Sequence, residues 1–241
     1  MMSAAERSAA ALTAHAAFEA WWAGDINSAE KLAAEAVRAD PNELLAWQAS
    51  ARFAAAGLRR VEGDNVVRAD LYAKRALRAA EKCVELGPND AESYRLLAAA
   101  LTGRDNKTAK EALEWATWRD PNNADNYVVR AHLVLAAEAP GPAAFDVADQ
   151  LLRQALAINP YNREAQRALG VNAIRRGSVH EGAYHLATAA AGNRAAEAAL
   201  PDTVRRLQRR FRPSRRVYVI AGVAVLILWR AIDFALSAAG G

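Results

Sequence analysis

Four short proline-centred segments divide the first two thirds of the chain. They read DPN at Asp40–Asn42, GPND at Gly87–Asp90, DPNN at Asp120–Asn123 and NPYN at Asn159–Asn162, and their prolines are separated by 47, 33 and 39 residues. Each lies between segments that carry small or apolar residues at helical spacing. Because proline ends a helix and Asn or Asp caps the next one, these segments predict a recurring helix–turn–helix unit of about 34 residues.

The composition supports helices throughout. The 241 residues are rich in alanine and contain only 13 glycines, eight prolines and five phenylalanines. Alanine is the strongest helix former, and a β-rich fold would need more turn and β-branched residues. We therefore expect an all-α protein.

The repeated unit resembles the tetratricopeptide repeat (TPR). The best-fitting segment has Leu169 and Gly170 at the Leu-Gly positions of that family, Gly177 at the turn, and Gly182 and Ala189 at two small positions. Aromatic residues also recur at the family's signature position, six residues after a proline: Trp47, Tyr94 and Tyr127. The resemblance covers about five units, residues 8–192, and implies an α-solenoid in which stacked helix pairs share one core.

Two insertions depart from the family pattern. The first, Leu58–Asp70, interrupts the second unit, and we expect it to lengthen the helices there. The second, Glu138–Asp146, contains two prolines and is expected to form a loop.

The resemblance also implies a binding groove lined by the first helix of each unit. In the family this groove holds segments of partner proteins. The residues that match the groove-facing positions, and that we predict to contact a partner, are Phe18, Trp21, Trp22, Gln48, Arg52, Arg95, Val128, His132, Arg167, Val171 and Arg175.

The groove arginines have two interpretations. Arginine binds carboxylates with a two-pronged geometry, which would favour an acidic partner segment. The alternative, which we favour, is that these arginines are solvated or paired with acids of the chain itself, such as Glu92, Asp125 and Glu164.

The sequence offers no catalytic constellation, so we predict a protein that is not an enzyme and that uses no cofactor, metal or small-molecule substrate. His180 and His185 are five residues apart and do not share a helix face, as two metal ligands would. The single cysteine, Cys83, occupies a small-residue position between helices and is expected to be a buried structural thiol.

The segment 193–216 is strongly basic. Removing the seven arginines of residues 205–216 and the Arg230–Asp233 pair leaves 23 basic and 26 acidic residues, so the basicity is local. Val204, Leu207 and Phe211 share one side of a predicted helix. Such a basic amphipathic helix is typical of a segment on an anionic membrane surface. The membrane-surface residues are Arg205, Arg206, Arg209, Arg210, Arg212, Arg215 and Arg216.

Residues 217–238 are predicted to form one transmembrane helix that anchors the chain by its tail. The run Val217–Trp229 carries no charge, and Arg230 and Asp233 follow at a spacing that lets them pair within the membrane or meet another membrane protein. Arginines that flank a span stay on the cytoplasmic side. The repeats would therefore face the cytoplasm, and the composition suggests a bacterial inner membrane.

The sequence thus predicts a non-catalytic, tail-anchored scaffold that recruits or assembles a protein complex. Its partners would be proteins, including an acidic segment or another membrane protein, together with anionic lipid. The alternative is a soluble nucleic-acid-associated regulator whose arginines at 205–216 contact phosphates. We favour the scaffold, because the chain outside that segment is slightly acidic.

Overall fold

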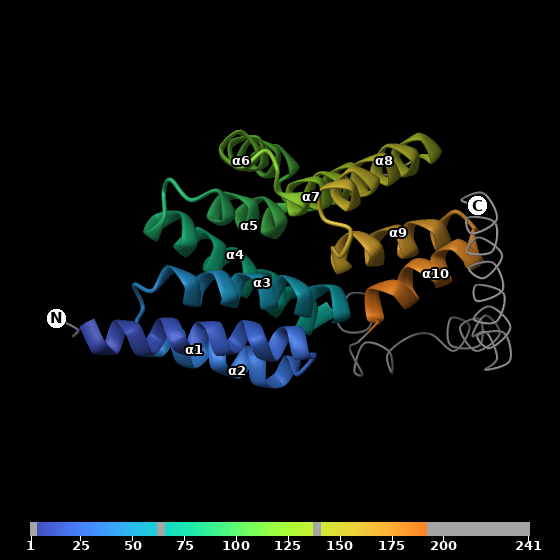
Figure 1. Ribbon diagram of the computed structural model, residues 1–241. Coiled ribbons are helices and arrows are strands. Elements are labelled where there is room, and N and C mark those ends of the chain that lie inside the picture. The colour runs from blue at the N-terminus through green and yellow to red at the C-terminus, as the bar shows by residue number, and fades with distance from the viewer. Residues whose placement is uncertain (1–3, 62–65, 137–140, 192–241) are drawn as a thin grey trace, which may run out of the picture. The chain divides into compact units, whose positions relative to one another are not determined.

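The computed structural model describes the chain except for residues 1–3, 62–65, 137–140 and 192–241. All described residues belong to one compact unit, Met1–Leu200. They form ten helices and no strand (Figure 1). The helices are α1 (Ala4–Ala23), α2 (Ile26–Ala39), α3 (Leu44–Val61), α4 (Val66–Leu86), α5 (Ala91–Leu101), α6 (Asn106–Arg119), α7 (Ala124–Leu135), α8 (Pro142–Ile158), α9 (Arg163–Arg175) and α10 (Val179–Ala190).

The helices pack as five consecutive pairs, which confirms the predicted solenoid of helix–turn–helix units. Each odd-numbered helix packs most extensively on the even-numbered helix that follows it. The odd-numbered helices also contact one another, α1 with α3, α3 with α5, α5 with α7 and α7 with α9, whereas successive even-numbered helices do not. The odd-numbered helices therefore form the inner layer of the stack, where the units lie closest together.

The proline segments end one unit and start the next, as predicted. Asp90, Asn123 and Asn162 are the N-caps of α5, α7 and α9, and each side chain accepts a hydrogen bond from a backbone N–H in the first turn. The indole Nε1 of Trp47 donates to the carbonyl of Pro41 at 2.8 Å. The signature aromatic of the second unit is thereby tied to the turn that precedes it.

Small side chains let the helices approach closely. Most buried residues of the core are alanines, with larger side chains such as Phe53, Leu113 and Leu152 filling the gaps. The backbones of α9 and α10 lie close together, since a Cβ atom on Gly182 would lie 2.8 Å from the carbonyl oxygen of Gly170. Only glycine fits at this crossing, which explains the Leu-Gly and small-residue positions of the fifth unit.

The two insertions behave differently. The first lengthens its helices, as expected, since α3 has 18 residues and α4 has 21. The second was expected to be a loop, and this is wrong for its later part, because α8 begins at Pro142. Proline suits the first turn of a helix, where its missing N–H would have no intrahelical partner.

The predicted basic segment 193–216 and the predicted span 217–238 lie outside the described residues. Among the helices that the structure does describe, none combines the length and apolar character needed to cross a bilayer.

Candidate partner-binding surface

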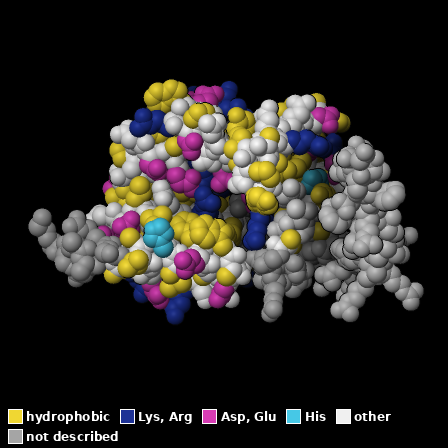
Figure 2. All heavy atoms as spheres, viewed as in Figure 1, with side chains coloured by type: hydrophobic (Ala, Val, Ile, Leu, Met, Phe, Trp, Pro, Cys, Tyr) yellow, Lys and Arg dark blue, Asp and Glu magenta, His cyan; other side chains and the backbone are white. Residues whose placement is uncertain are grey.

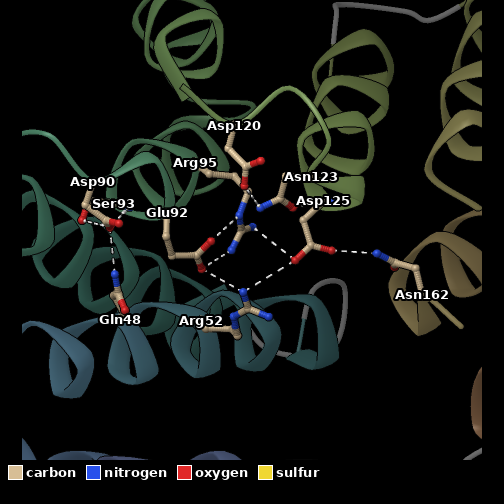
Figure 3. Close-up of polar contacts among 10 residues, drawn as sticks. All are labelled: Gln48, Arg52, Asp90, Glu92, Ser93, Arg95, Asp120, Asn123, Asp125 and Asn162. Carbon is tan, nitrogen blue, oxygen red and sulfur yellow. Dashed lines mark hydrogen bonds and ion pairs between the residues drawn. The ribbon is translucent and has the colours of Figure 1, made fainter. Parts of the chain in front are cut away.

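A chain of polar contacts links the inner helices of units two to five (Figure 3). Its centre is the α5 pair Glu92 and Arg95, whose side chains form an ion pair reinforced by two hydrogen bonds. Arg52 on α3 donates to Glu92 at 2.8 Å and lies 3.6 Å from Asp125 on α7. Arg95 also approaches Asp125, at 3.9 Å. Two arginines and two acids from three units thus form one charge-balanced cluster.

The electrostatics of this cluster favour its ionised form. Burial by itself would raise the pKa of Glu92, but the charges of Arg95 and Arg52 and their hydrogen bonds outweigh it and lower the pKa to about 2. Arg95 is only 6% exposed, and although burial opposes its charge, Glu92 and Asp125 raise its pKa. A buried arginine held this way is a structural link between units, because removing Glu92 would leave Arg95 buried with only the more distant Asp125 to balance its charge.

Helix caps extend the cluster at both ends. Asp90 accepts hydrogen bonds from the backbone N–H and hydroxyl of Ser93 and, from α3, the amide of Gln48 at 2.8 Å. At the other end the amide of Asn162, the N-cap of α9, donates to Asp125 at 2.7 Å. The caps therefore connect neighbouring units as well as starting their own helices.

The prediction that groove arginines pair with acids of the chain is confirmed for three of them. Arg52 and Arg95 bind the acids named above, and Arg167 binds Glu164 one turn away at 2.8 Å. In the face that Figure 2 shows, acidic and basic side chains lie next to one another in the hollow at its middle. Arg175 is exposed and has no ion-pair partner among the described residues. The inner surface is thus largely charge-neutral.

Three predicted contact residues pack in or against the core: Val128 is buried, whereas Phe18 and Trp21 are half-buried. Val128 is 3% exposed and packs in the cluster between α7, α8 and α9, so it is not a groove residue. Phe18 and Trp21 on α1 pack against Phe53 of α3, the indole of Trp21 stacking on its ring with centroids 4.9 Å apart. Their rings join the first two units because aromatic pairs in contact stabilise a core.

Apart from the buried Arg95, the other predicted contact residues keep accessible surface. Trp22 is 63% exposed, although its ring lies 5.9 Å from that of Phe18. His132, Val171 and Gln48 are half-buried. Trp22 therefore provides the large exposed aromatic surface on α1, while α7 and α9 present smaller contact areas.

The described residues hold no cluster of metal-binding side chains. Cys83 is fully buried, as predicted. Burial first, and then the charges of Glu92 and Asp90, raise the pKa of its thiol to about 12. A thiol of this kind is neutral and inert at physiological pH.

Five stacked helix pairs with an inner layer of first helices define an α-solenoid of the TPR type. Comparison with solved structures agrees. TTC0263, a thermophilic TPR protein of Thermus thermophilus, is similar with a TM-score of 0.57 and 18% identity, over 83% of this chain and 97% of that one. At this identity the likeness shows the fold alone.

Two further structures are similar at lower TM-scores. MamA has a TM-score of 0.40 and 20% identity over 76% of this chain and 91% of its own. PilW, a type IV pilus biogenesis factor, has a TM-score of 0.48 and 17% identity over 83% of this chain and 82% of its own. No protein-family model and no curated protein matches the sequence.

Proposed function

We propose that this protein is a non-catalytic interaction scaffold whose TPR-type solenoid holds a protein partner against its inner helices. The observation that carries this proposal is the continuous polar chain from Gln48 to Asn162, which fixes four successive units relative to one another. A surface held rigid before binding loses little conformational freedom when a partner docks.

The partner chemistry follows from which groups remain available. Arg52, Arg95 and Arg167 are engaged with the chain's own acids, so a partner that relied on carboxylates would have to displace them. The accessible groups are the aromatic ring of Trp22 and the exposed guanidinium of Arg175. A mixed segment with an apolar anchor and one acidic group fits this surface better than a uniformly acidic one.

Site-specific photo-crosslinking tests the binding surface. A photoreactive amino acid at Arg175, on the inner helix α9, is expected to yield adducts with a protein partner in cells. The matched control is Tyr184, which is 67% exposed on the even-numbered helix α10. Adducts that form equally at both positions, or only at Tyr184, would contradict the assignment of the inner helices as the binding surface.

We further propose that residues 217–238 anchor the scaffold in a membrane with its repeats in the cytoplasm, in a bacterial inner membrane. The support is the sequence. From Val217 to Ser237 there are 11 Val, Ile, Leu or Phe residues, which together favour insertion by about 3 to 7 kcal/mol. Arg230 and Asp233 would cost about 5 to 7 kcal/mol at the bilayer centre. They lie toward the far end, where the cost is lower and the two can pair.

The arginines at 205–216 would bind anionic headgroups on the cytoplasmic side. Tethering raises the local concentration of whatever the inner surface binds, which suits the recruitment of a complex at the membrane. Arg230 and Asp233 are a contact point for a second membrane protein. Substituting both with Leu tests this contact, and retention of every co-purifying membrane protein would contradict it.

A high-salt wash separates this proposal from nucleic-acid binding by the same arginines. Binding to phosphates of DNA or RNA weakens steeply as salt rises, whereas a spanning helix stays in the membrane. We expect the full chain to remain with membranes in high salt after nuclease treatment. Quantitative release under these conditions would contradict the anchor.

A further inference from the structure

Helix α4 is longer than its neighbours in the outer layer. It has 21 residues, whereas α2 and α6 have 14 each. Seven more residues add about 10 Å at 1.5 Å per residue. Tyr72 packs on both neighbouring helices, because its ring lies against Gly57 of α3 and its hydroxyl donates to Glu30 of α2 at 3.3 Å. Residues 66–71, before Tyr72, form the N-terminal tip of α4 and are exposed except for the half-buried Ala69.

This tip of α4 exposes large apolar side chains. Val66 is 85% exposed, Val67 is 80% exposed and Leu71 is 55% exposed. All three lie within the first two turns of one helix, and Val67 and Leu71 share a face at a spacing of four residues. Single exposed apolar residues are common, but a cluster of three at one end of a helix indicates a surface that binds a membrane or another molecule.

The same face of α4 continues as a basic stripe. Lys74 and Arg78 follow Val67 and Leu71 at helical spacing, and Arg75 lies beside them. Between Val66 and Arg78 the helix carries four basic residues and one acid. Lys74 pairs with that acid, Asp70, at 2.7 Å on the exposed surface, so the stripe as a whole keeps a positive charge.

Arg75 and Arg78 border an open cavity. The cavity has a volume of about 250 Å³ and is lined by Trp47, Ser50 and Ala79 in addition to the two arginines. The guanidinium of Arg75 lies 5.7 Å from the centre of the Tyr72 ring, and Arg78 has no ion-pair partner in the part of the chain that the structure describes. The cavity therefore lies beside the basic stripe, and its two guanidinium groups can bind a phosphate.

We propose that the outward face of α4 is a second membrane contact, which lies on an anionic phospholipid surface. Val66, Val67 and Leu71 would enter the headgroup region, while Arg75 and Arg78 bind lipid phosphates. An apolar cluster flanked by Lys and Arg is the pattern of helices that lie in a membrane interface. Each basic residue near an anionic surface adds to the attraction.

This inference rests on the proposed membrane location, which brings the solenoid to the lipid. Fully extended, the segment 192–216 spans at most about 90 Å, so its length does not prevent α4 from reaching the surface. The tip is tested separately from the anchor, because a probe on α4 reports its own surroundings whether or not residues 217–238 span the bilayer.

The experiment uses the full chain with a single environment-sensitive fluorophore on Val67→Cys. The matched control is Leu12→Cys, at a residue 67% exposed on α1. Cys83 is fully buried, so we expect it to stay unlabelled. Treating the unsubstituted chain with the same fluorophore checks this. Both labelled proteins are mixed with vesicles of phosphatidylcholine alone or with phosphatidylglycerol added.

On anionic vesicles we expect the emission at position 67 to shift to shorter wavelength and its quenching by iodide to fall several-fold, with no change at position 12. Combining Val67→Cys with Arg75→Gln and Arg78→Gln should abolish the shift. The proposal is overturned if the two positions respond alike or if neutral vesicles give the same shift. It is also overturned if the shift grows with protein concentration without lipid, which would indicate a second copy of the chain as the occupant.

Discussion

Replacing Glu92 with Gln removes the charge at the centre of the inner polar chain. The pKa of Glu92 falls from 4.5 to about 2 on folding, and this shift corresponds to about 3 kcal/mol of stabilisation at neutral pH. Asp125 remains near both Arg52 and Arg95, at 3.6 and 3.9 Å, and offsets part of the loss. We therefore expect Glu92→Gln to lower the free energy of unfolding by about 2 to 3 kcal/mol.

The assay is urea unfolding of the full chain in detergent micelles, followed by far-UV circular dichroism. Glu85→Gln is the matched control, because Glu85 also pairs with a basic residue three positions away but is 67% exposed in its side chain. An exposed pair of this kind contributes at most about 1 kcal/mol. If Glu92→Gln costs no more than Glu85→Gln, the polar chain does not stabilise the stack and the reasoning fails.

Acid titration gives an independent check of the same pair. Because the folded-state pKa of Glu92 lies below the unfolded value of 4.5, its stabilisation is fully present above about pH 4.5. The stabilisation is lost as the pH falls toward 2. The difference in unfolding free energy between the unsubstituted chain and Glu92→Gln should therefore shrink over this interval. A difference that stays constant from neutral pH to pH 2 would mean that Glu92 is not held ionised by its arginines.

Three further predictions concern the fold. Gly182→Ala places a Cβ atom 2.8 Å from the carbonyl oxygen of Gly170, so it should destabilise the chain by about 1 to 3 kcal/mol in urea unfolding; an unchanged midpoint would contradict the close crossing of α9 and α10. Asp90→Ala removes three hydrogen bonds that cap α5 and bind α3, and should cost about 2 kcal/mol. Asp25→Ala removes only an exposed cap bond of α2 and should cost less. A larger loss of stability for Asp25→Ala than for Asp90→Ala would contradict the inference that Asp90 also links its unit to the preceding one. Cys83 should resist thiol reagents at mildly alkaline pH until the chain unfolds, because burial raises its pKa to about 12; rapid reaction of the folded chain would show that it is accessible.

The repeat could be predicted from the sequence because its signals are local. Proline, the capping residues Asp90 and Asn162, and small residues such as Gly170 and Gly182 act within a turn or between adjacent helices. Their spacing therefore indicates paired helices without knowledge of the superhelix. The start of α8 at Pro142 was missed because proline suits both a loop and the first turn of a helix.

The site could be predicted only in part. Pairs one turn apart, such as Arg95 with Glu92, follow from helical spacing. The bond from Asn162 to Asp125 joins residues 37 positions apart, and it depends on how far each unit rotates relative to the next. Val128 was misplaced for a related reason. An inner helix packs against several neighbouring helices, so only a narrow stripe of its surface stays accessible to a partner. A small error in the predicted rotation of the helix about its axis therefore assigns a core residue to that stripe, as happened for Val128.

The most direct test of the scaffold's proposed place at the membrane is alkaline carbonate extraction. The full chain and a truncation to residues 1–202 are expressed in bacteria, and their membranes are washed in carbonate and then in detergent. We predict that the full chain stays in the pellet until detergent is added, and that the truncated chain is released by carbonate. Release of the full chain by carbonate alone would contradict the anchor and leave a solenoid that binds its partners without one.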